Sequence, residues 1–129
     1  MTFDESIFKA YDVRGIYPDQ LNPEVAEKIG QAFVVFLGAK KILVGSDMRI
    51  SSPALSEAFI RGARRQGADV VSLGLISTDC LYFAAGKYGL PGAMITASHN
   101  PKEYNGVKLC RSGAEPIGQD TGLQKIKEL

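Results

Sequence analysis

The most unusual stretch of the sequence is the polar segment at residues 96–101, which reads TASHNP. It places Ser98 beside His99, and the Asn-Pro pair within it is typical of a turn, as is the Asn-Gly pair at residues 105–106. Lys108 follows two residues later. Residue types alone leave two interpretations: a Ser- and Asn-rich turn between strands, or a nucleophilic serine with a histidine next to it.

A Ser–His hydrolase is the less consistent of the two. Its histidine must reach the serine oxygen and must itself be held by a third group, whereas neighbouring residues on an extended chain point to opposite sides. The GxSxG pattern that exposes a nucleophilic serine in many hydrolases is also absent from the sequence. A polar turn therefore remains the interpretation that residue types favour.

Helix and strand patterns alternate along the chain and must position this segment. Asn22, Pro23 and Gly38 are typical of the cap, first turn and stop of a helix. Further helices are predicted from Ser51 or Ser52 to Gly67, from Ser77 or Thr78 to about Gly89, and over residues 119–129. Strands are predicted at residues 41–45, 69–73, 92–96 and 107–109.

This alternation predicts an α/β fold. Strands separated by helices of about ten to fifteen residues favour a three-layer α/β/α domain with a mixed, mostly parallel sheet of about four strands. In such sheets ligands bind beyond the carboxyl ends of the strands. That rule directs attention to residues 45–49 and, above all, to residues 97–108.

Composition excludes several classes of protein. The 129 residues include 15 Lys and Arg against 14 Asp and Glu, a net charge of +1 that argues against a nucleic-acid or membrane-surface binder. No run approaches the ~20 apolar residues of a membrane span, and residues 1–5 lack the basic-then-apolar pattern of a signal peptide, so a cytoplasmic protein is expected. Cys80 and Cys110 form no zinc pattern and are expected to be free thiols rather than one disulfide.

Three segments together resemble a known enzyme family. These are residues 96–101 with YNGVK at 104–108, FKAYDVRG at 8–15, and VGSDMR at 44–49. They resemble the phosphoserine loop, the N-terminal signature and the glycine–x–Asp–x–Arg segment of the α-D-phosphohexomutases, in family order. This family comprises the phosphomannomutase/phosphoglucomutase enzymes and their phosphoglucosamine mutase relatives. The tyrosine in the first signature favours the phosphomannomutase/phosphoglucomutase branch.

The resemblance covers essentially the whole chain, residues 1–129, but only the first of the family's four domains. In the family the metal-binding aspartate loop belongs to the second domain, sugar recognition to the third and phosphate-group recognition to the fourth. None of those motifs occurs in this sequence. The chain is therefore expected to be the N-terminal domain I, with the three further domains of the same enzyme as its partners.

For Ser98 the resemblance implies a covalent role. The family's serine carries a phosphoryl group, gives it to a hexose phosphate and takes another back from the bisphosphate intermediate. Phosphoserine bears about −1.5 to −2 charges at neutral pH, so it needs cations and donors around it. The resemblance implies Mg²⁺ bound through the phosphate oxygens on Ser98 and a hexose 1,6-bisphosphate activator. Arg14 would offer a fork of donors to the phosphate.

Lys108 occupies the position of the family's general acid/base, and the resemblance makes it a substrate-binding candidate together with His99 and Tyr11. A free lysine titrates near ~10.4, so base catalysis at neutral pH requires burial or cationic neighbours. Each residue also has a structural alternative. Lys108 would be an exposed strand-edge lysine, His99 a residue that holds the loop, and Tyr11 an ordinary core tyrosine. Asp47 and Arg49 are predicted to be a structural pair that supports the loop.

Two classes of function are consistent with these observations. The first is an enzyme: the phosphoserine-bearing domain of a Mg²⁺-dependent phosphohexomutase that interconverts hexose 1-phosphate and 6-phosphate and is inactive as an isolated domain. The alternatives are a non-catalytic phosphosugar-binding or interaction module, or a phosphoglucosamine mutase. Phosphate on Ser98 would separate enzyme from module. The basic stripe of Arg61, Arg64 and Arg65 is predicted to be surface or interdomain contact rather than a phosphate site.

Overall fold

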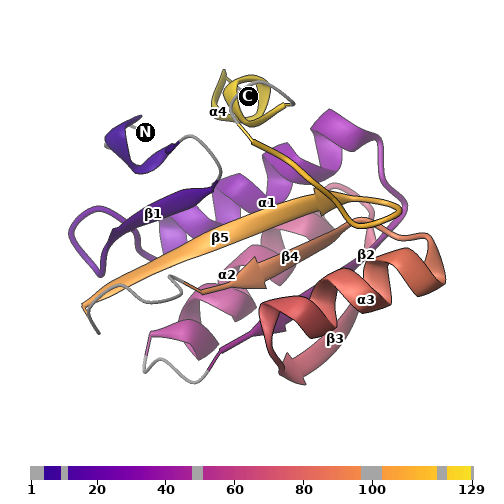
Figure 1. Cartoon of the computed structure of the whole chain (residues 1–129). Helices are drawn as coiled ribbons and strands as arrows, with labels where there is room; N and C mark the ends of the chain where they lie inside the picture. The colour runs from indigo at the N-terminus through magenta and orange to yellow at the C-terminus, as the bar shows by residue number, and fades with distance from the viewer. Residues whose placement is uncertain (1–4, 10–11, 48–50, 97–102, 119–121, 129) are drawn as a thin grey trace.

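A mixed β-sheet forms the middle layer of the fold (Figure 1). The computed structural model describes residues 5–9, 12–47, 51–96, 103–118 and 122–128. The strands within them are β1 (Val13–Ile16), β2 (Lys41–Ser46), β3 (Asp69–Leu75), β4 (Gly92–Ile95), β5 (Tyr104–Arg111) and β6 (Glu115–Pro116). They are ordered β1-β5-β4-β2-β3, with β6 beside β5. In the sequence, residues 96–103 therefore connect the interior strands β4 and β5, whereas residues 8–15 lead into the edge strand β1.

Helices cover both faces of the sheet, which confirms the three-layer α/β/α fold class. One face packs against α1 (Pro23–Leu37), α2 (Ser52–Arg65) and α4 (Leu123–Glu128), and the other against α3 (Thr78–Tyr88). In the larger core the rings of Phe33 and Phe59 lie 6.0 Å apart between α1 and α2. In the smaller core Leu81 of α3 packs with Leu43 and Met94. A short 3-10 helix, η1 (Glu5–Ile7), precedes β1.

Capping residues set the ends of two helices as predicted. The Asn22 side chain accepts a hydrogen bond from the Val25 N–H at 3.0 Å, which satisfies one of the open donors at the start of α1. Gly38 ends α1 in the left-handed conformation, with φ at 60°. Ser77 likewise accepts from the Cys80 N–H at 3.1 Å and caps α3. Short local signals of this kind are readable in the sequence because they involve neighbouring residues only.

The sheet has more strands than the four predicted and fewer parallel pairs. Among the described residues six strands make five pairings: β2 runs parallel to β3 and β4, whereas β5 runs antiparallel to β1, β4 and β6. β5 also has eight residues, against the three predicted at 107–109. Asn105 and Lys108 interrupt its apolar pattern because their side chains belong to polar sites rather than to the core.

Three elements match the predictions only in part or not at all. β1 was not predicted, because four residues that include an arginine and a glycine carry too little apolar periodicity. The predicted cap of α2 is confirmed in position only: Ser51 is the N-cap residue, but it makes no capping bond, and its hydroxyl instead accepts from the Asn105 amide at 2.8 Å. Of the helix predicted over 119–129, the structure describes α4, while residues 119–121 and 129 lie outside the described residues.

Helices α1 and α2 approach each other closely at two glycines. A Cβ added at Gly30 would strike the carbonyl oxygen of Phe59, and one added at Gly62 would strike the carbonyl oxygen of Glu27. Both obstacles are backbone atoms, which cannot move without displacing a turn of helix. The two glycines therefore set the distance between α1 and α2.

Replacing Gly62 with alanine is expected to lower the free energy of unfolding by about 1–3 kcal/mol, the usual cost of overpacking, although alanine is the better helix former. Gly86→Ala in α3 is the matched control, because its added Cβ meets only the Ala114 side chain at 3.9 Å. The control should be neutral or stabilising by up to ~1 kcal/mol. Urea unfolding of the purified chain measures both, and equal stability of the two variants would contradict the close packing.

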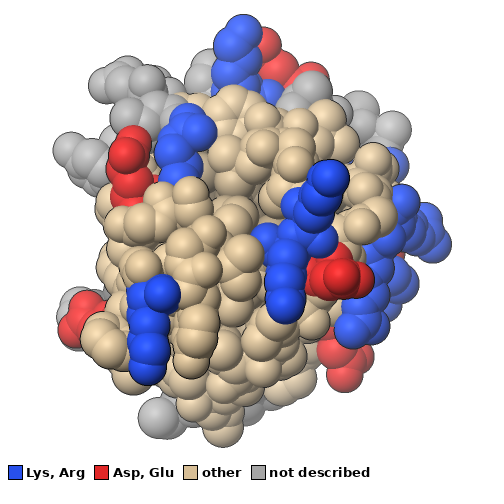
Figure 2. Space-filling model, turned by 90° about the vertical axis from the view of Figure 1, so that its right-hand side faces the viewer, with Lys and Arg blue, Asp and Glu red and all other residues tan. Residues whose placement is uncertain are grey.

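The cysteines and the surface charges are consistent with the expectations from composition. Cys80 is exposed and Cys110 buried, and both are free thiols as predicted. On the face shown in Figure 2, basic side chains are spread over the surface and several lie beside acidic ones. Arg61 and Arg65 of α2 contact Glu27 of α1 at 2.6 and 3.2 Å, and the hydrogen bond from Arg61 lowers the pKa of that carboxyl. In the described part of the chain no helix has the length and apolar character needed to cross a membrane.

Candidate active site

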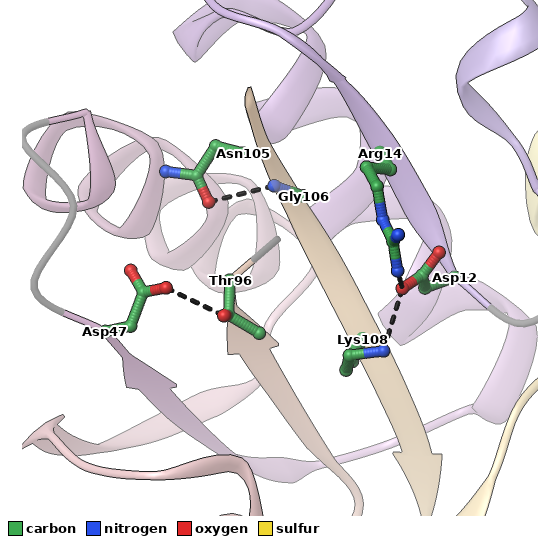
Figure 3. Close-up of polar contacts among 7 residues, drawn as sticks. All are labelled: Asp12, Arg14, Asp47, Thr96, Asn105, Gly106 and Lys108. Atoms are coloured by element: carbon green, nitrogen blue, oxygen red, sulfur yellow. Dashed lines mark hydrogen bonds and ion pairs between the residues drawn. The ribbon is translucent and has the colours of Figure 1, made fainter. Parts of the chain in front are cut away.

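Three charged side chains meet where β1 and the residue before it lie beside β5 (Figure 3). The Oδ2 atom of Asp12 accepts a hydrogen bond from Nη2 of Arg14 at 2.6 Å and another from Nζ of Lys108 at 2.8 Å. The Asp12 side chain is 3% exposed, whereas those of Arg14 and Lys108 are 29% and 20% exposed. One negative and two positive groups leave this charged cluster with a formal charge of +1, and solvent reaches its cations rather than its carboxylate.

The register of β1 against β5 brings the charged cluster together. Arg14 lies opposite Gly106, and the same register continued by two residues places Asp12 opposite Lys108. Side chains alternate between the faces of a strand, so the three charged groups share one face. Lys108 also lies opposite Met94 of β4, which packs in the core under α3. The charged cluster therefore lies on the face of the sheet that α3 covers in part.

Two further titratable side chains, Tyr82 and Cys110, lie on the same face of the sheet. Burial raises the pKa of the Tyr82 phenol, and the nearby Cys110 and Asp12 raise it further. Burial also raises the pKa of the Cys110 thiol. Both groups are uncharged near neutral pH, so they leave the formal charge of the charged cluster unchanged.

A second polar network joins the ends of β2 and β4 to the start of α2 and to β5. Asp47, which follows β2, accepts hydrogen bonds from the Thr96 and Ser52 hydroxyls, each at 2.7 Å. The Asn105 amide donates to Ser52 at 3.0 Å and also to Ser51. Figure 3 draws the Asp47–Thr96 contact together with the charged cluster. This network is named here the loop clamp, and its members are Asp47, Ser51, Ser52, Thr96 and Asn105.

The structure brings together the predicted site residues that it describes. Arg14 and Lys108 share one carboxylate. Asp47 accepts hydrogen bonds from Ser52 and Thr96, which were not predicted as its partners, and its predicted pairing with Arg49 stays a prediction. Lys108 is not an exposed edge lysine, because β5 lies between β1 and β4 and the ammonium is ion-paired. Four predicted residues lie outside the described residues: Tyr11, Arg49, Ser98 and His99.

Sequence reasoning missed Asp12, the residue that joins the two cations. Its signal was present, because Asp12 and Arg14 are two residues apart and side chains at that spacing share one face of a strand. This spacing is informative only if residues 12–14 are extended. The pairing of β1 with β5, which makes them so, is a long-range contact that the sequence pattern does not reveal.

A metal site does not form from the described residues alone. They include no group of three His, Cys, Asp or Glu side chains that could hold a metal ion. The nearby carboxylates are engaged, Asp12 with two cations and Asp47 with two hydroxyls. The charged cluster offers guanidinium and ammonium donors instead, which are the groups that bind phosphate oxygens in proteins.

Replacing Asp12 with alanine is expected to lower the free energy of unfolding by about 1–3 kcal/mol. Removing one partner of a fully buried ion pair costs ~3–5 kcal/mol, and the partial exposure of the two cations reduces that cost. Urea unfolding of the purified chain gives the value. Asp69→Ala, at the exposed start of β3, serves as the control and should change stability by at most ~0.5 kcal/mol.

A double-mutant cycle tests whether the loss arises from the ion pair itself. In a chain that already carries Lys108→Met, the Asp12→Ala change should cost less, because one of the two cations has gone. Strictly additive losses would show that Asp12 and Lys108 act on stability independently, contrary to the geometry.

Comparisons with known proteins show which family this chain is similar to. A family model described as phosphoglucomutase/phosphomannomutase, alpha/beta/alpha domain I, matches residues 5–129. Phosphomannomutases of Klebsiella pneumoniae and Escherichia coli are each 47% identical over 123 residues, which cover 95% of this chain. The match covers 78% of the first protein but 27% of the second, so the chain spans about a quarter of the Escherichia coli relative.

A solved structure gives the same result in three dimensions. The phosphoglucomutase/phosphomannomutase family protein of Burkholderia thailandensis is 37% identical to this chain, with a TM-score of 0.87. The match covers 98% of this chain and 30% of the Burkholderia protein. The residues matched by the family model include both strands of the charged cluster and all members of the loop clamp. The chain belongs to the phosphoglucomutase/phosphomannomutase family, as its α/β/α domain I.

Proposed function

We propose that this chain is the phosphoserine-bearing domain of a phosphohexomutase, which interconverts hexose 1-phosphates and 6-phosphates through a bisphosphate intermediate. The observation that carries the proposal is that Thr96, two residues before Ser98 in the sequence, is hydrogen-bonded to the strand pair that carries the charged cluster. The Thr96 N–H donates to the Gly106 carbonyl at 2.9 Å, and Gly106 lies opposite Arg14. The segment that holds Ser98 therefore starts next to the strand pair that carries the charged cluster.

In the proposed reaction Ser98 carries a phosphoryl group between two oxygens of the sugar. The bond from phosphorus to Ser98 Oγ breaks while a sugar hydroxyl oxygen bonds to phosphorus. The Lys108 ammonium gives a proton to the departing serine oxygen, and the proton of the attacking hydroxyl restores it. The other phosphate of the bisphosphate then returns to Ser98 by the same exchange in reverse, so the enzyme ends each cycle phosphorylated.

The charged cluster suits an anion of this kind. Arg14 would donate to phosphate oxygens, and a local charge of +1 favours the approach of a sugar phosphate. Mg²⁺, when bound, would neutralise further charge on the phosphoryl group. The described residues hold no metal-ligating group of three, and we propose that its protein ligands besides the phosphate on Ser98 come from the second domain of the enzyme.

The proposed substrates are mannose and glucose phosphates. The two relatives compared above are phosphomannomutases, and the signature at residues 8–15 carries the tyrosine of that branch. His99 and Tyr11 are proposed to contact the sugar phosphate, and a hexose 1,6-bisphosphate is proposed as activator. The cytoplasmic location expected from the sequence stays a prediction.

Phosphopeptide mapping tests the proposal. Full-length enzyme incubated with glucose 1,6-bisphosphate labelled with ³²P is expected to carry label on Ser98 and to convert mannose 1-phosphate to mannose 6-phosphate. The Ser98→Ala enzyme should take up no label, whereas Ser77→Ala, which alters the exposed cap of α3, should be labelled normally. Label on another serine would overturn the assignment of Ser98, and a wild-type protein with neither label nor turnover would favour a non-catalytic module.

A further inference from the structure

We propose that the loop clamp positions the segment at residues 97–102 for phosphoryl transfer, so that its members are positioning residues for the reaction. The inference rests on the proposed function, which makes Ser98 of that segment the phosphate carrier. It adds a group of side chains that take no part in the chemistry and that nevertheless govern its rate.

The first end of the segment is held at Thr96. Its hydroxyl donates to Asp47 Oδ2 at 2.7 Å, and its backbone N–H donates to the Gly106 carbonyl at 2.9 Å. The backbone N–H of Asp47 in turn donates to the Ile95 carbonyl at 3.1 Å. Side-chain and backbone bonds together therefore fix Thr96, which is 4% exposed, against two strands.

The second end is held at Asn105, which is fully buried. Its Nδ2 donates to the hydroxyls of Ser51 and Ser52 at 2.8 and 3.0 Å, and its Oδ1 accepts from the Gly106 N–H at 2.8 Å. The amide thus uses both of its donor hydrogens and its acceptor within the protein. Such an amide is held in one orientation, because any rotation would leave a buried polar group without a partner.

A continuous path of hydrogen bonds connects the two ends. The Asn105 amide donates to Ser52, the Ser52 hydroxyl donates to Asp47 Oδ1, and Thr96 donates to the other oxygen of the same carboxylate. The separation of Thr96 and Asn105 is thereby tied to the start of α2 as well as to the sheet. A network whose members are all satisfied specifies one geometry more strictly than apolar packing does.

The chemistry explains why such a fixed separation matters. In phosphoryl transfer the protein accelerates the reaction mainly by positioning the groups and stabilising their charge. The rate therefore depends strongly on the alignment of the donor and acceptor oxygens. A misplacement of about 1 Å can cost about a hundredfold in rate. Because residues 97–102 join Thr96 to Glu103, the loop clamp controls the frame on which Ser98 is mounted.

Thr96→Val in the full-length enzyme tests the inference, because valine keeps the shape of threonine and removes the hydroxyl donor. We expect single-turnover transfer from labelled Ser98 to mannose 1-phosphate to fall by roughly 10- to 100-fold per labelled site. The KM for mannose 1-phosphate in steady-state turnover should change less than threefold. Thr96→Ser, which keeps the hydroxyl, should restore transfer to within a few-fold of wild type. Thr78→Val at the start of α3 is the matched control and should transfer at the wild-type rate.

Counting only labelled enzyme separates positioning from stability. A purely structural role would lower the melting temperature and the labelled fraction, but would leave transfer per labelled site unchanged, and that result would overturn the inference. If Thr96→Val does not fold, Ser51→Ala serves instead, because it removes one acceptor from Asn105 and leaves Ser52 in place. We expect Ser51→Ala to lower transfer per labelled site several-fold. Transfer at the wild-type rate would overturn the inference. Absence of label or turnover in the wild-type enzyme would count against the proposed function and not against the loop clamp.

Discussion

Replacing Lys108 with methionine is expected to lower the kcat of the full-length enzyme by ~10²–10⁴, the usual contribution of a general acid/base group. Methionine keeps the length of the side chain and removes the proton-carrying amine. The fold should survive, because Asp12 keeps its 2.6 Å contact with Arg14. The measurement is steady-state conversion of mannose 1-phosphate to mannose 6-phosphate, with unfolding curves of the same preparations.

Two further variants distinguish proton transfer from charge at this position. Lys108→Arg keeps the positive charge, but a guanidinium is not deprotonated at accessible pH, so it should not restore turnover. Lys41→Met removes an exposed lysine at the start of β2 and should leave kcat unchanged. Wild-type turnover in Lys108→Met would remove Lys108 from the mechanism, and full activity in Lys108→Arg would show that only its charge is needed.

The same residue shows where sequence and structure diverge. Resemblance to a family marked Lys108 as a candidate acid/base, but the strand that carries it was predicted with three residues and has eight. Apolar periodicity located α1 and α3 because their caps and core faces are local features. It did not locate β1, whose stability as a strand comes from pairing with β5, about ninety residues later in the chain.

The polar contacts of the site were hidden for a related reason. Asp12 meets Lys108 across a separation of 96 residues, and Asp47 meets Thr96 across 49. Neither pair leaves a periodic signal in the sequence, because each depends on strand order and register. Ser51 shows the consequence: a serine two residues before Pro53 predicts a capping side chain, whereas the Ser51 hydroxyl accepts a hydrogen bond from Asn105, 54 residues further on.

The second large effect concerns the chain by itself. We expect residues 1–129 to fold but to show no mutase turnover above background, for two physical reasons. The described residues hold no metal-ligating group of three, so they provide no carboxylate set for Mg²⁺, which needs several oxygen ligands. The charged cluster is also partly open, with its cations 29% and 20% exposed. A phosphoryl group in an open site is exposed to hydrolysis in place of transfer.

The assay is conversion of mannose 1-phosphate or glucose 1-phosphate to the 6-phosphate by the purified chain, with Mg²⁺ and bisphosphate activator. A cooperative urea transition of the same preparation shows that the chain is folded. The Ser98→Ala chain, purified in parallel, identifies contaminating host enzyme, because turnover that persists in this variant cannot use Ser98. Turnover that is present in the wild-type chain and abolished by Ser98→Ala would show that domain I is sufficient for catalysis, and the need for further domains would have to be abandoned. Activity that appears only when the three further domains are supplied is the result that we expect, because the site is open and the described residues hold no carboxylate set for Mg²⁺.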